Sequence, residues 1–253
     1  MLNIVVPMAG LGSRFAKAGF ALPKPLIPVH SVPMIQLVIA NITPAVPHRF
    51  IFICQNQHIA EYDLRTKLAN WAPGCETIGI DGQTDGAACT VLAARTLIDD
   101  TSPLMIANSD QFVDCEIDDY LDDISGRGLD GLIMTMWADD PKWSYAAINA
   151  QGHATEVVEK QVISNHATVG IYNFRSGRAF VAAADAMIAA DLRVNGEFYV
   201  APVYNQMIAA GARIGVHDIG SVGAGMYGLG IPSDLEAFLA LPLSHDAVAR
   251  VTA

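Results

Sequence analysis

The sequence has few basic residues and few cysteines, and these shortages exclude several classes of protein. Among its 253 residues, 15 are lysine or arginine and 26 are aspartate or glutamate, so the formal net charge is -11. A nucleic-acid partner is disfavoured, because nucleic-acid binding depends on lysine and arginine side chains that neutralise phosphates. The four cysteines form no Cys-x-x-Cys pair, which argues against a zinc site and a disulfide framework. We therefore expect reduced thiols and a cytoplasmic protein.

The sequence also lacks a long apolar run. Residues 2–6 are apolar, but this stretch is too short for a signal peptide and no basic segment precedes it. Residues 179–192 form the most apolar later stretch, which contains Asp185 and is too short to span a bilayer. We therefore expect no membrane association. Hydrophobic residues still make up 52% of the chain, enough for a sizeable core, so disorder is not expected.

Apolar runs of strand length alternate with helical patterns in the first half of the chain. Strands are predicted at residues 2–6, 50–54, 77–80, 104–107 and 131–137, and helices at residues 34–41, 58–71, 87–97 and 117–124. Strands separated by helices favour parallel pairing, with helices on both faces of the sheet. The predicted fold is therefore α/β, with a single mixed and mostly parallel sheet covered on both faces.

The pattern changes after about residue 138, where strands follow one another with few helices between them. Strands are predicted at residues 145–149, 155–159, 168–174 and 213–216, and helices at residues 177–190, 198–210 and 234–241. No proline- or serine-rich linker and no internal repeat separates the two parts. We expect one domain over residues 1–253, with a first half of about residues 1–137 and a second half of about residues 138–253.

A glycine turn follows the first predicted strand, where residues 8–15 read MAGLGSRF. Two glycines permit a sharp turn and a close approach to a ligand, so that several backbone N–H groups can converge on one anion. Arg14 and Lys24 add two cations. The guanidinium group of Arg14 is planar and has several hydrogen-bond donors, whereas the ammonium group of Lys24 is a compact charge. The combination suits a triphosphate. The candidate nucleotide-binding residues of the turn are Ala9, Gly10, Leu11, Gly12 and Ser13.

Two other phosphate-binding loops fit this turn less well. A dinucleotide-binding loop requires a third glycine at the position that Phe15 occupies. The phosphate loop of P-loop enzymes requires Gly-Lys-Ser/Thr, which the sequence does not contain.

The fuller pattern is Ala-Gly-x-Gly-x-Arg-Phe, followed from Lys24 by Lys-Pro-Leu-Ile-Pro-Val. It resembles the signature of the sugar-phosphate nucleotidyltransferases, the nucleoside-diphosphate-sugar pyrophosphorylases. The resemblance implies a Rossmann-like nucleotidyltransferase fold, with the nucleotide bound by the first half and the acceptor by the second. It implies that an acceptor phosphate, by default a sugar 1-phosphate, attacks the α-phosphorus of a nucleoside triphosphate. Pyrophosphate leaves, and the product is an activated nucleotide sugar for surface polysaccharide synthesis.

The resemblance also implies roles for the charged residues near the turn. Arg14 would hold the leaving end of the triphosphate, and Lys24 would stabilise the charge on the α-phosphate. Asp110 follows the strand predicted at residues 104–107, and ligands bind at the carboxyl ends of such strands. Its carboxylate suits Mg²⁺, although an aspartate there can also cap a following helix. The resemblance favours the metal, so Mg²⁺ is the expected cofactor.

A second nucleotide-binding turn is expected at Gln83 and Gly86, which open the helix predicted at residues 87–97. The Gln83 side chain has donors and acceptors, so it can read the edge of a base, and Gly86 permits a close approach. A plain turn with a helix cap is the alternative. The segment is similar to the family's Gln-x-x-Gly-x-Ala turn, which favours UTP, dTTP or CTP.

The candidate acceptor-binding residues are Glu159, Lys160, Gly170 and Glu197. By resemblance, Glu159 contacts the sugar, Lys160 holds the acceptor phosphate, and the sugar lies against the backbone at Gly170. Each assignment has a purely structural alternative. Glu159 and Lys160 could form an ion pair at the protein surface, and Gly170 could belong to a buried strand that binds no ligand. The match is incomplete, because Gln161 stands where family members have proline, and Ala201-Pro202 replace a Thr-Asp pair after Glu197.

The largest departure from the family pattern lies near residue 230. The family has an aspartate, its second metal ligand, shortly before a Gly-Thr-Pro turn, whereas Gly228 stands there in this chain, before Gly230-Ile231-Pro232. Asp218 is one candidate replacement, and water in the metal's coordination shell is the other.

Two other functions are compatible with the sequence. A glycosyltransferase that uses a nucleotide sugar would need only one metal-binding acid, but it would not explain Arg14 and Lys24. A nucleotide-sugar sensor without catalysis would explain the glycine at position 228. The sequence does not determine the oligomeric state.

Overall fold

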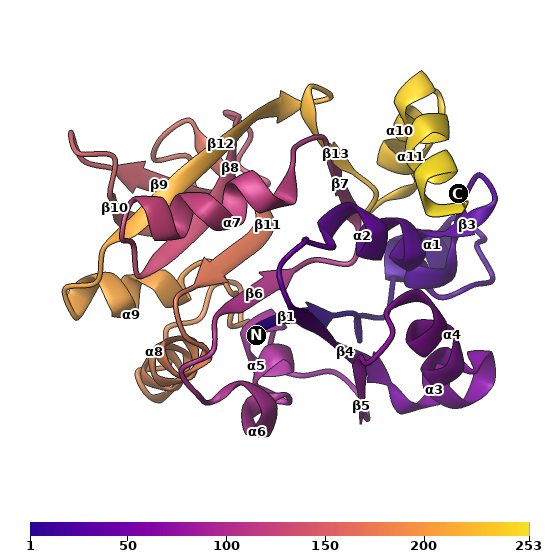
Figure 1. Ribbon diagram of the computed structural model, residues 1–253, viewed down its shortest axis with the longest axis horizontal. Helices are drawn as coiled ribbons and strands as arrows, with labels where there is room; N and C mark the ends of the chain where they lie inside the picture. Colours follow the sequence, from indigo (N-terminus) through magenta and orange to yellow (C-terminus); the bar gives the residue numbers. More distant parts are fainter. Residues whose placement is uncertain (253) are drawn as a thin grey trace.

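The apolar runs of the sequence form the strands of one large sheet in the computed structural model, which describes residues 1–252 (Figure 1). The last residue of the predicted domain, residue 253, lies outside the described residues. The strands are β1 (Leu2–Pro7), β2 (Pro28–Val29), β3 (Val32–Pro33), β4 (His48–Gln55), β5 (Glu76–Ile80), β6 (Leu104–Ala107), β7 (Gln111–Val113), β8 (Gly131–Trp137), β9 (Ser144–Ile148), β10 (Ala154–Glu159), β11 (His166–Phe174), β12 (Ile214–Val222) and β13 (Gly225–Gly228).

Helices connect most of the strands, and a short 3-10 turn spans Lys24–Leu26. The helices are α1 (Ser13–Lys17), α2 (Met34–Ile42), α3 (Asn56–Tyr62), α4 (Leu64–Trp71), α5 (Ala87–Leu92), α6 (Arg95–Ile98), α7 (Ile117–Gly126), α8 (Gly177–Ala189), α9 (Val203–Ala209), α10 (Pro232–Leu239) and α11 (Pro242–Thr252). None of the helices within residues 1–252 is both long enough and apolar enough to cross a membrane.

The large sheet has the strand order β5-β4-β1-β6-β11-β8-β12-β13-β7, with β9 and β10 beside β11. The strands β5, β4, β1 and β6 are parallel to one another, whereas β11 runs antiparallel to both β6 and β8. The β6–β11 pair therefore joins strands from the first and second halves of the chain in one sheet. This arrangement confirms the predicted fold class, a mixed sheet in an α/β protein.

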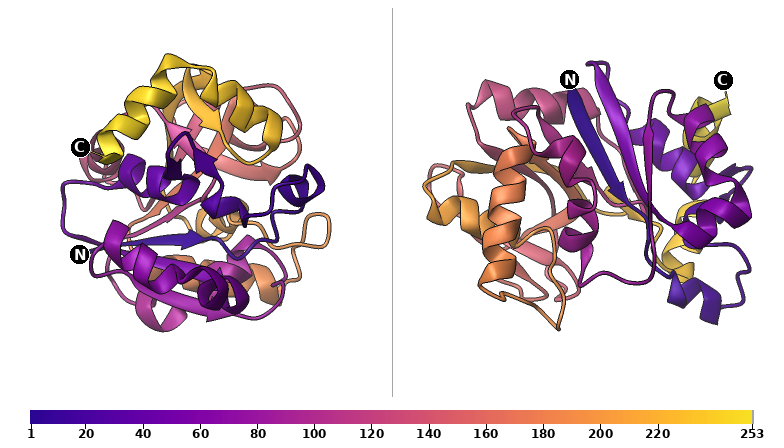
Figure 2. Two further views of the ribbon diagram at one scale, coloured as in Figure 1. Left: turned by 90° about the vertical axis from the view of Figure 1, so that its right-hand side faces the viewer. Right: turned by 90° about the horizontal axis from the view of Figure 1, so that it is seen from below.

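The sheet is covered by helices on both faces (Figures 1 and 2). In β1, Ile4 and Val6 belong to one buried apolar cluster and Val5 to the other, because successive side chains of a strand point to opposite faces. Helices α2, α4 and α7 supply the cluster on the first face, and helices α5, α6, α8 and α9 supply the second. Each large apolar side chain that is fully buried contributes roughly 1.5–3 kcal/mol.

A third apolar cluster lies beside the sheet and joins segments that are far apart in the sequence. Phe15 of α1, Val32 of β3, Phe112 of β7 and Phe238 of α10 are all buried in it. Helix α11 consequently lies next to α2, and α10 packs against α11 and β13 (Figure 1). The cluster brings the start of α10 to the end of the sheet where β7 and β13 pair.

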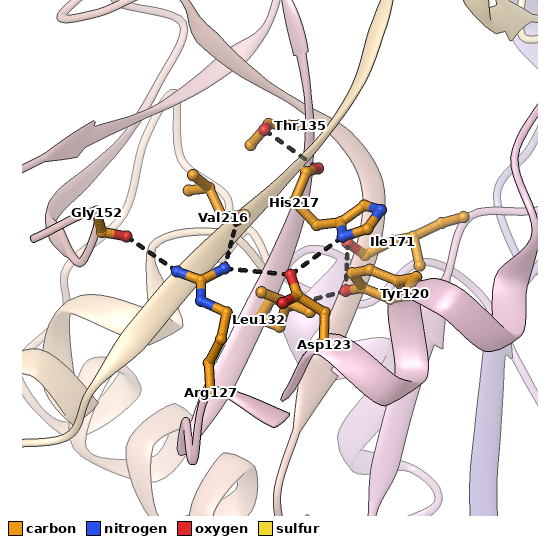
Figure 3. A network of polar contacts seen from close by, with 9 residues as sticks. All are labelled: Tyr120, Asp123, Arg127, Leu132, Thr135, Gly152, Ile171, Val216 and His217. Carbon is orange, nitrogen blue, oxygen red and sulfur yellow. Dashed lines mark hydrogen bonds and ion pairs between the residues drawn. The ribbon is translucent and has the colours of Figure 1, made fainter. Parts of the chain in front are cut away.

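Polar contacts fasten α7 to the middle of the sheet (Figure 3). The hydroxyl of Tyr120, which is fully buried, donates to the carbonyl oxygen of Leu132 in β8 (2.7 Å). The Asp123 carboxylate accepts a hydrogen bond from Arg127 (3.1 Å) and lies 3.1 Å from Nδ1 of His217 in β12. One face of α7 is therefore held by packing and by hydrogen bonds to two neighbouring strands.

Three predicted helices differ from the observed ones. The helix predicted at residues 58–71 is divided into α3 and α4 by Asp63, whose φ of 50° is left-handed. The helix predicted at residues 87–97 is likewise divided, into α5 and α6. The helix predicted at residues 198–210 begins only at Val203, because Phe198 instead forms backbone hydrogen bonds with Asp85 and Ala88.

Several short elements were not predicted from the sequence. They are α1, the β2–β3 hairpin, β7, β13 and α11. Strands β7 and β13 contain 3 and 4 residues, which is too short for an alternating pattern to be recognised. Both contribute residues to the cavity described below, Gln111 from β7 and Met226 and Gly228 from β13.

Two helical glycines are expected to respond oppositely to substitution by alanine. A Cβ at Gly177 in α8 would lie 1.9 Å from the carbonyl oxygen of Ile98, whereas a Cβ at Gly126, an exposed residue of α7, would have no neighbour within 4 Å. Gly177→Ala should therefore lower the free energy of unfolding by about 1–3 kcal/mol. Gly126→Ala should raise it by up to about 1 kcal/mol, through helix propensity. Urea unfolding measures both, and a neutral or stabilising Gly177→Ala would contradict the packing at the start of α8.

Candidate active site

A cavity of about 390 Å³ lies where the two halves of the sheet meet, and it collects many of the residues singled out in the sequence. Arg14 lines it from α1, Asp110 from the turn after β6, and Glu159 and Lys160 from the end of β10. Gly170 of β11 lines it as well. Candidate catalytic, metal-binding and acceptor-binding residues, up to 156 positions apart in the chain (14 to 170), therefore face one space, whereas the candidate nucleotide-binding residues of the two turns do not line it.

The glycine turn connects β1 to α1 at one side of this cavity. Gly12 has a left-handed φ of 59° and precedes the first residue of α1. A Cβ at Gly12 would lie 3.1 Å from Cβ of Lys24, so the glycine allows the turn to pack against that lysine. Ala9 is buried, whereas Gly10, Leu11, Ser13 and Arg14 are exposed. The turn is thus anchored at both ends and open to a ligand between them.

Lys24 and Asp110 form an ion pair, with 2.8 Å between Nζ and Oδ2. Their side chains are 21% and 24% exposed, so the pair is largely shielded from solvent. The sequence predicted that Lys24 stabilises the α-phosphate and that Asp110 binds the metal, and the structure brings the two side chains into direct contact. An anion that binds here meets a lysine whose charge is shared with a carboxylate.

Gln55 is a positioning residue that sequence reasoning missed. It is buried at the end of β4, and its Nε2 donates to the carbonyl oxygens of Ala9 (2.6 Å) and Gly82 (2.7 Å). One side chain therefore ties the glycine turn to the turn that carries Gln83, which is exposed. The available signal in the sequence was a polar residue closing an apolar strand.

Gly86 makes a close approach, but to the protein's own backbone. A Cβ there would lie 2.5 Å from both the N and the O of Phe198. Backbone hydrogen bonds on either side, Phe198 to Asp85 (2.7 Å) and Ala88 to Phe198 (3.0 Å), hold the two segments together. The packing against Phe198 requires a glycine at position 86 whether or not a nucleotide binds there. The predicted role of Gly86 in nucleotide binding stays a prediction.

The opposite side of the cavity carries the candidate acceptor residues. Glu159 is buried and accepts a hydrogen bond from the Ser144 hydroxyl. Burial raises the pKa of its carboxyl group, while the Ser144 hydrogen bond and the Lys160 charge oppose that shift. Nζ of Lys160 donates to the hydroxyl of Tyr199 (2.9 Å), a bond that raises the pKa of the lysine. Glu197 is exposed and does not line the cavity, although its charge acts on Glu159 and Lys160.

Several cavity residues were not assigned a function from the sequence. Lys142 and Trp143 line the cavity beside Lys160. Gln111 is 3% exposed, and its Nε2 has no hydrogen-bond partner among the described residues. A Cβ at Gly170, whose φ is 84°, would lie 2.7 Å from Oε1 of Gln111, so the glycine makes room for this amide. Gln111 consequently carries a buried, unpaired donor at the cavity wall.

The region of the expected second metal ligand differs from the sequence-based hypothesis. Asp218 lies within β12, is exposed, accepts a hydrogen bond from the backbone of Gly220 (3.0 Å) and does not line the cavity. Asp218 therefore lies outside the cavity wall, where it cannot replace the missing acid, and that suggestion is wrong. Asp234 of α10 lines the cavity instead, beside Gly228. Within residues 1–252, no three histidine, cysteine or acidic side chains are grouped closely enough to hold a metal by themselves.

The chain is similar to known proteins over most of its length. A family model described as nucleotidyl transferase matches residues 4–201. A mannose-1-phosphate guanyltransferase of Gibberella zeae is 28% identical over 185 residues, which cover 68% of this chain and 49% of that protein. The chain thus spans about half the length of the curated relatives it matches.

Solved structures share its fold. The nucleoside-diphosphate-sugar pyrophosphorylase from Vibrio cholerae RC9 has a TM-score of 0.79 and 25% identity, over 94% of this chain and 100% of that one. The inositol-1-phosphate CTP transferase from T. maritima has a TM-score of 0.73 and 14% identity, over 99% of this chain and 96% of that one.

Replacing Gln55 by leucine tests how the two turns are held. Leucine keeps the packing but leaves two carbonyl oxygens without their donor, so Gln55→Leu should lower the free energy of unfolding by about 1–3 kcal/mol. Amide hydrogen exchange should become faster in residues 8–12 and 82–86. Asn56→Ala is the matched control, because the Asn56–Asp81 hydrogen bond is exposed, and it should change stability by less than about 0.5 kcal/mol. Unchanged exchange in Gln55→Leu would show that other contacts hold the turns.

Proposed function

Because this chain belongs to the nucleotidyl transferase family of sugar-phosphate nucleotidyltransferases, we propose that it transfers a nucleotidyl group from a nucleoside triphosphate to a sugar 1-phosphate. An oxygen of the acceptor phosphate attacks the α-phosphorus and forms a new P–O bond. The bond from the α-phosphorus to the bridging oxygen breaks, and pyrophosphate leaves with that oxygen. The product is a nucleotide sugar, which we propose is used in surface polysaccharide synthesis.

The observation that carries this proposal is the composition of the one cavity. Arg14 and Asp110, with Lys24 bound to Asp110, lie on the side of the glycine turn, while Glu159 and Lys160 lie on the other. The acceptor phosphate is already an anion, so the reaction needs no protein nucleophile. Catalysis then depends on alignment of the two substrates and on neutralisation of charge at the transferring phosphorus. Cations on both sides of one space support this mechanism.

Each cation in the proposal has a separate task. Arg14 and the backbone N–H groups of the glycine turn hold the leaving end of the triphosphate, and Lys24 stabilises the α-phosphate. Lys160 holds the acceptor phosphate, where its raised pKa keeps it protonated. Glu159 accepts hydrogen bonds from sugar hydroxyls, because its carboxylate is buried at the cavity wall beside Ser144.

The residues near Asp110 fit the Mg²⁺ that the family implies. Mg²⁺ prefers oxygen ligands, and Asp110 presents a carboxylate to the cavity beside the position of the triphosphate. A Cβ at Gly230 would lie 2.6 Å from Oδ2 of Asp110, so the glycine keeps the space around this oxygen free of a side chain. When bound there, Mg²⁺ supplies positive charge to phosphate oxygens.

The nucleobase is a finer part of the proposal. We propose that Gln83 reads the base and favours a pyrimidine, because its amide can donate and accept at once. Its exposed position next to Gly82, which Gln55 ties to the glycine turn, supports a contact with a nucleotide held by that turn. Two of the three similar proteins named above have a guanine or a cytosine nucleotide in their names, so all common bases belong in a test.

The function is tested first by thermal unfolding with each nucleoside triphosphate and with common nucleotide sugars, with and without Mg²⁺. A ligand at about 100 times its dissociation constant adds roughly 2.7 kcal/mol to the free energy of unfolding. We expect one triphosphate to stabilise the protein, more strongly with Mg²⁺, and to release pyrophosphate when a sugar 1-phosphate such as mannose 1-phosphate is added. Stabilisation by nucleotide sugars alone, without pyrophosphate release, would instead favour a glycosyltransferase or a sensor.

Lys24→Ala tests the electrostatic mechanism. Loss of one preorganised contact to the reacting phosphate should lower the rate of pyrophosphate release by about 10²–10³-fold. Lys17→Ala removes an exposed lysine from α1 and serves as the control, with a rate close to that of the wild type. Circular dichroism should confirm that both variants are folded. Turnover by Lys24→Ala at the wild-type rate would refute the role of this lysine.

A further inference from the structure

A second carboxylate, that of Asp234, faces the cavity without a partner. Asp234 lies in the first turn of α10 and lines the cavity with Asp110. Its carboxylate has no hydrogen bond and no ion pair with any described residue, whereas the Asp110 carboxylate is paired with Lys24. An unpaired negative charge at the wall of an anion-binding cavity repels the ligand unless a cation is bound between them.

The carboxylate of Asp234 lies close to the backbone at position 228. A Cβ at Gly228 would lie 3.0 Å from Oδ2 of Asp234, and a Cβ at Gly230 would lie 2.6 Å from Oδ2 of Asp110. Two carboxylate oxygens thus lie against two glycines that are separated by one residue at the end of β13. A side chain at position 228 would make a tight contact with the Asp234 carboxylate in its present position.

Backbone contacts hold the two acids at this strand end. The carbonyl oxygen of Asp110 accepts a hydrogen bond from the backbone N–H of Leu229 (2.8 Å), the residue between the two glycines. Leu235, which follows Asp234, is buried with Phe238 in the third apolar cluster and fixes the start of α10. The two carboxylates therefore come to the end of β13 from separate parts of the fold, one held by a backbone hydrogen bond and the other by packing.

We propose that Asp234 and Asp110 together bind the divalent cation, with Asp234 supplying from α10 the carboxylate that Gly228 does not supply from β13. The proposal rests on the proposed function, because the phosphate oxygens of the substrates complete the site. Mg²⁺ is commonly bound by one or two carboxylates, with water and substrate phosphates in the remaining positions. When the cation binds to Asp110, the ammonium group of Lys24 becomes available to the α-phosphate.

An aspartate in the first turn of a helix also stabilises the helix through its dipole, without any metal. The chain offers a matched control for this effect in Asp119. Asp119 is the third residue of α7, as Asp234 is the third residue of α10, but it is exposed and does not line the cavity. A dipole effect alone predicts the same behaviour for substitutions at both positions, namely a change in stability and none in metal affinity.

The test is a titration of the full chain with Mn²⁺ alone, in which the electron paramagnetic resonance signal of the free ion reports binding. We expect Asp234→Asn and Asp110→Asn each to weaken Mn²⁺ binding at least about tenfold, a loss that even outer-shell partners of a metal produce. Asp119→Asn should bind Mn²⁺ as the wild type does. The double variant Gly228→Asp/Asp234→Ala, which returns the acid to the strand in the vacated space, should recover most of the lost affinity.

The outcomes separate this inference from the proposed function. Wild-type Mn²⁺ affinity in Asp234→Asn, or no binding by the wild type, would overturn the assignment of Asp234. Pyrophosphate release by the wild type in the presence of Mg²⁺ would nevertheless leave the transferase standing. If Asp234 is a ligand, Asp234→Asn should also need at least about tenfold more Mg²⁺ for half-maximal pyrophosphate release. Absence of pyrophosphate release from the wild type with every triphosphate would count against the proposed function alone.

Discussion

The break between β6 and β7 at residues 108–110 is the constraint on which the candidate site depends. Before the break, the backbone N–H of Asn108 donates to the carbonyl oxygen of Gly170 in β11 (2.9 Å). After it, the carbonyl oxygen of Asp110 accepts from the backbone N–H of Leu229 (2.8 Å). Three distant parts of the chain therefore meet at one turn through backbone hydrogen bonds. The side chain of Asp110 is presented to the cavity by the sheet itself.

The charges around this turn differ from those of the whole molecule. The chain has a net charge of -11, yet Arg14, Lys142 and Lys160 line the cavity, and Lys24 is bound to Asp110 at its edge. Exposed charges more than about 8 Å away are largely screened at physiological ionic strength. An acidic protein can therefore hold a polyanion where a few cations are placed at contact distance.

Glycines near the site make room for other parts of the protein as well as for ligands. Gly86 accommodates the backbone of Phe198, and Gly228 accommodates the carboxylate of Asp234. Both were interpreted from the sequence in terms of a ligand, one as a close approach to a base and the other as a missing metal ligand. The distinction could not be made from the sequence, because Phe198 and Asp234 were not yet known to lie beside these glycines.

The sequence by itself determined the α/β class, the parallel strands of the first half, and the glycine turn with Arg14, Lys24 and Asp110 as its charged residues. These features follow from local rules, since apolar periodicity and glycine content act over a few neighbouring residues. Only the tertiary structure decided that Gln55 ties two turns together, that Gln111 presents an unpaired amide, and that Asp234 lies beside Asp110 at the cavity. Each of these depends on contacts between residues far apart in the chain. Such contacts are set by how the helices and strands pack, which segments as short as β7 and β13 do not reveal in advance.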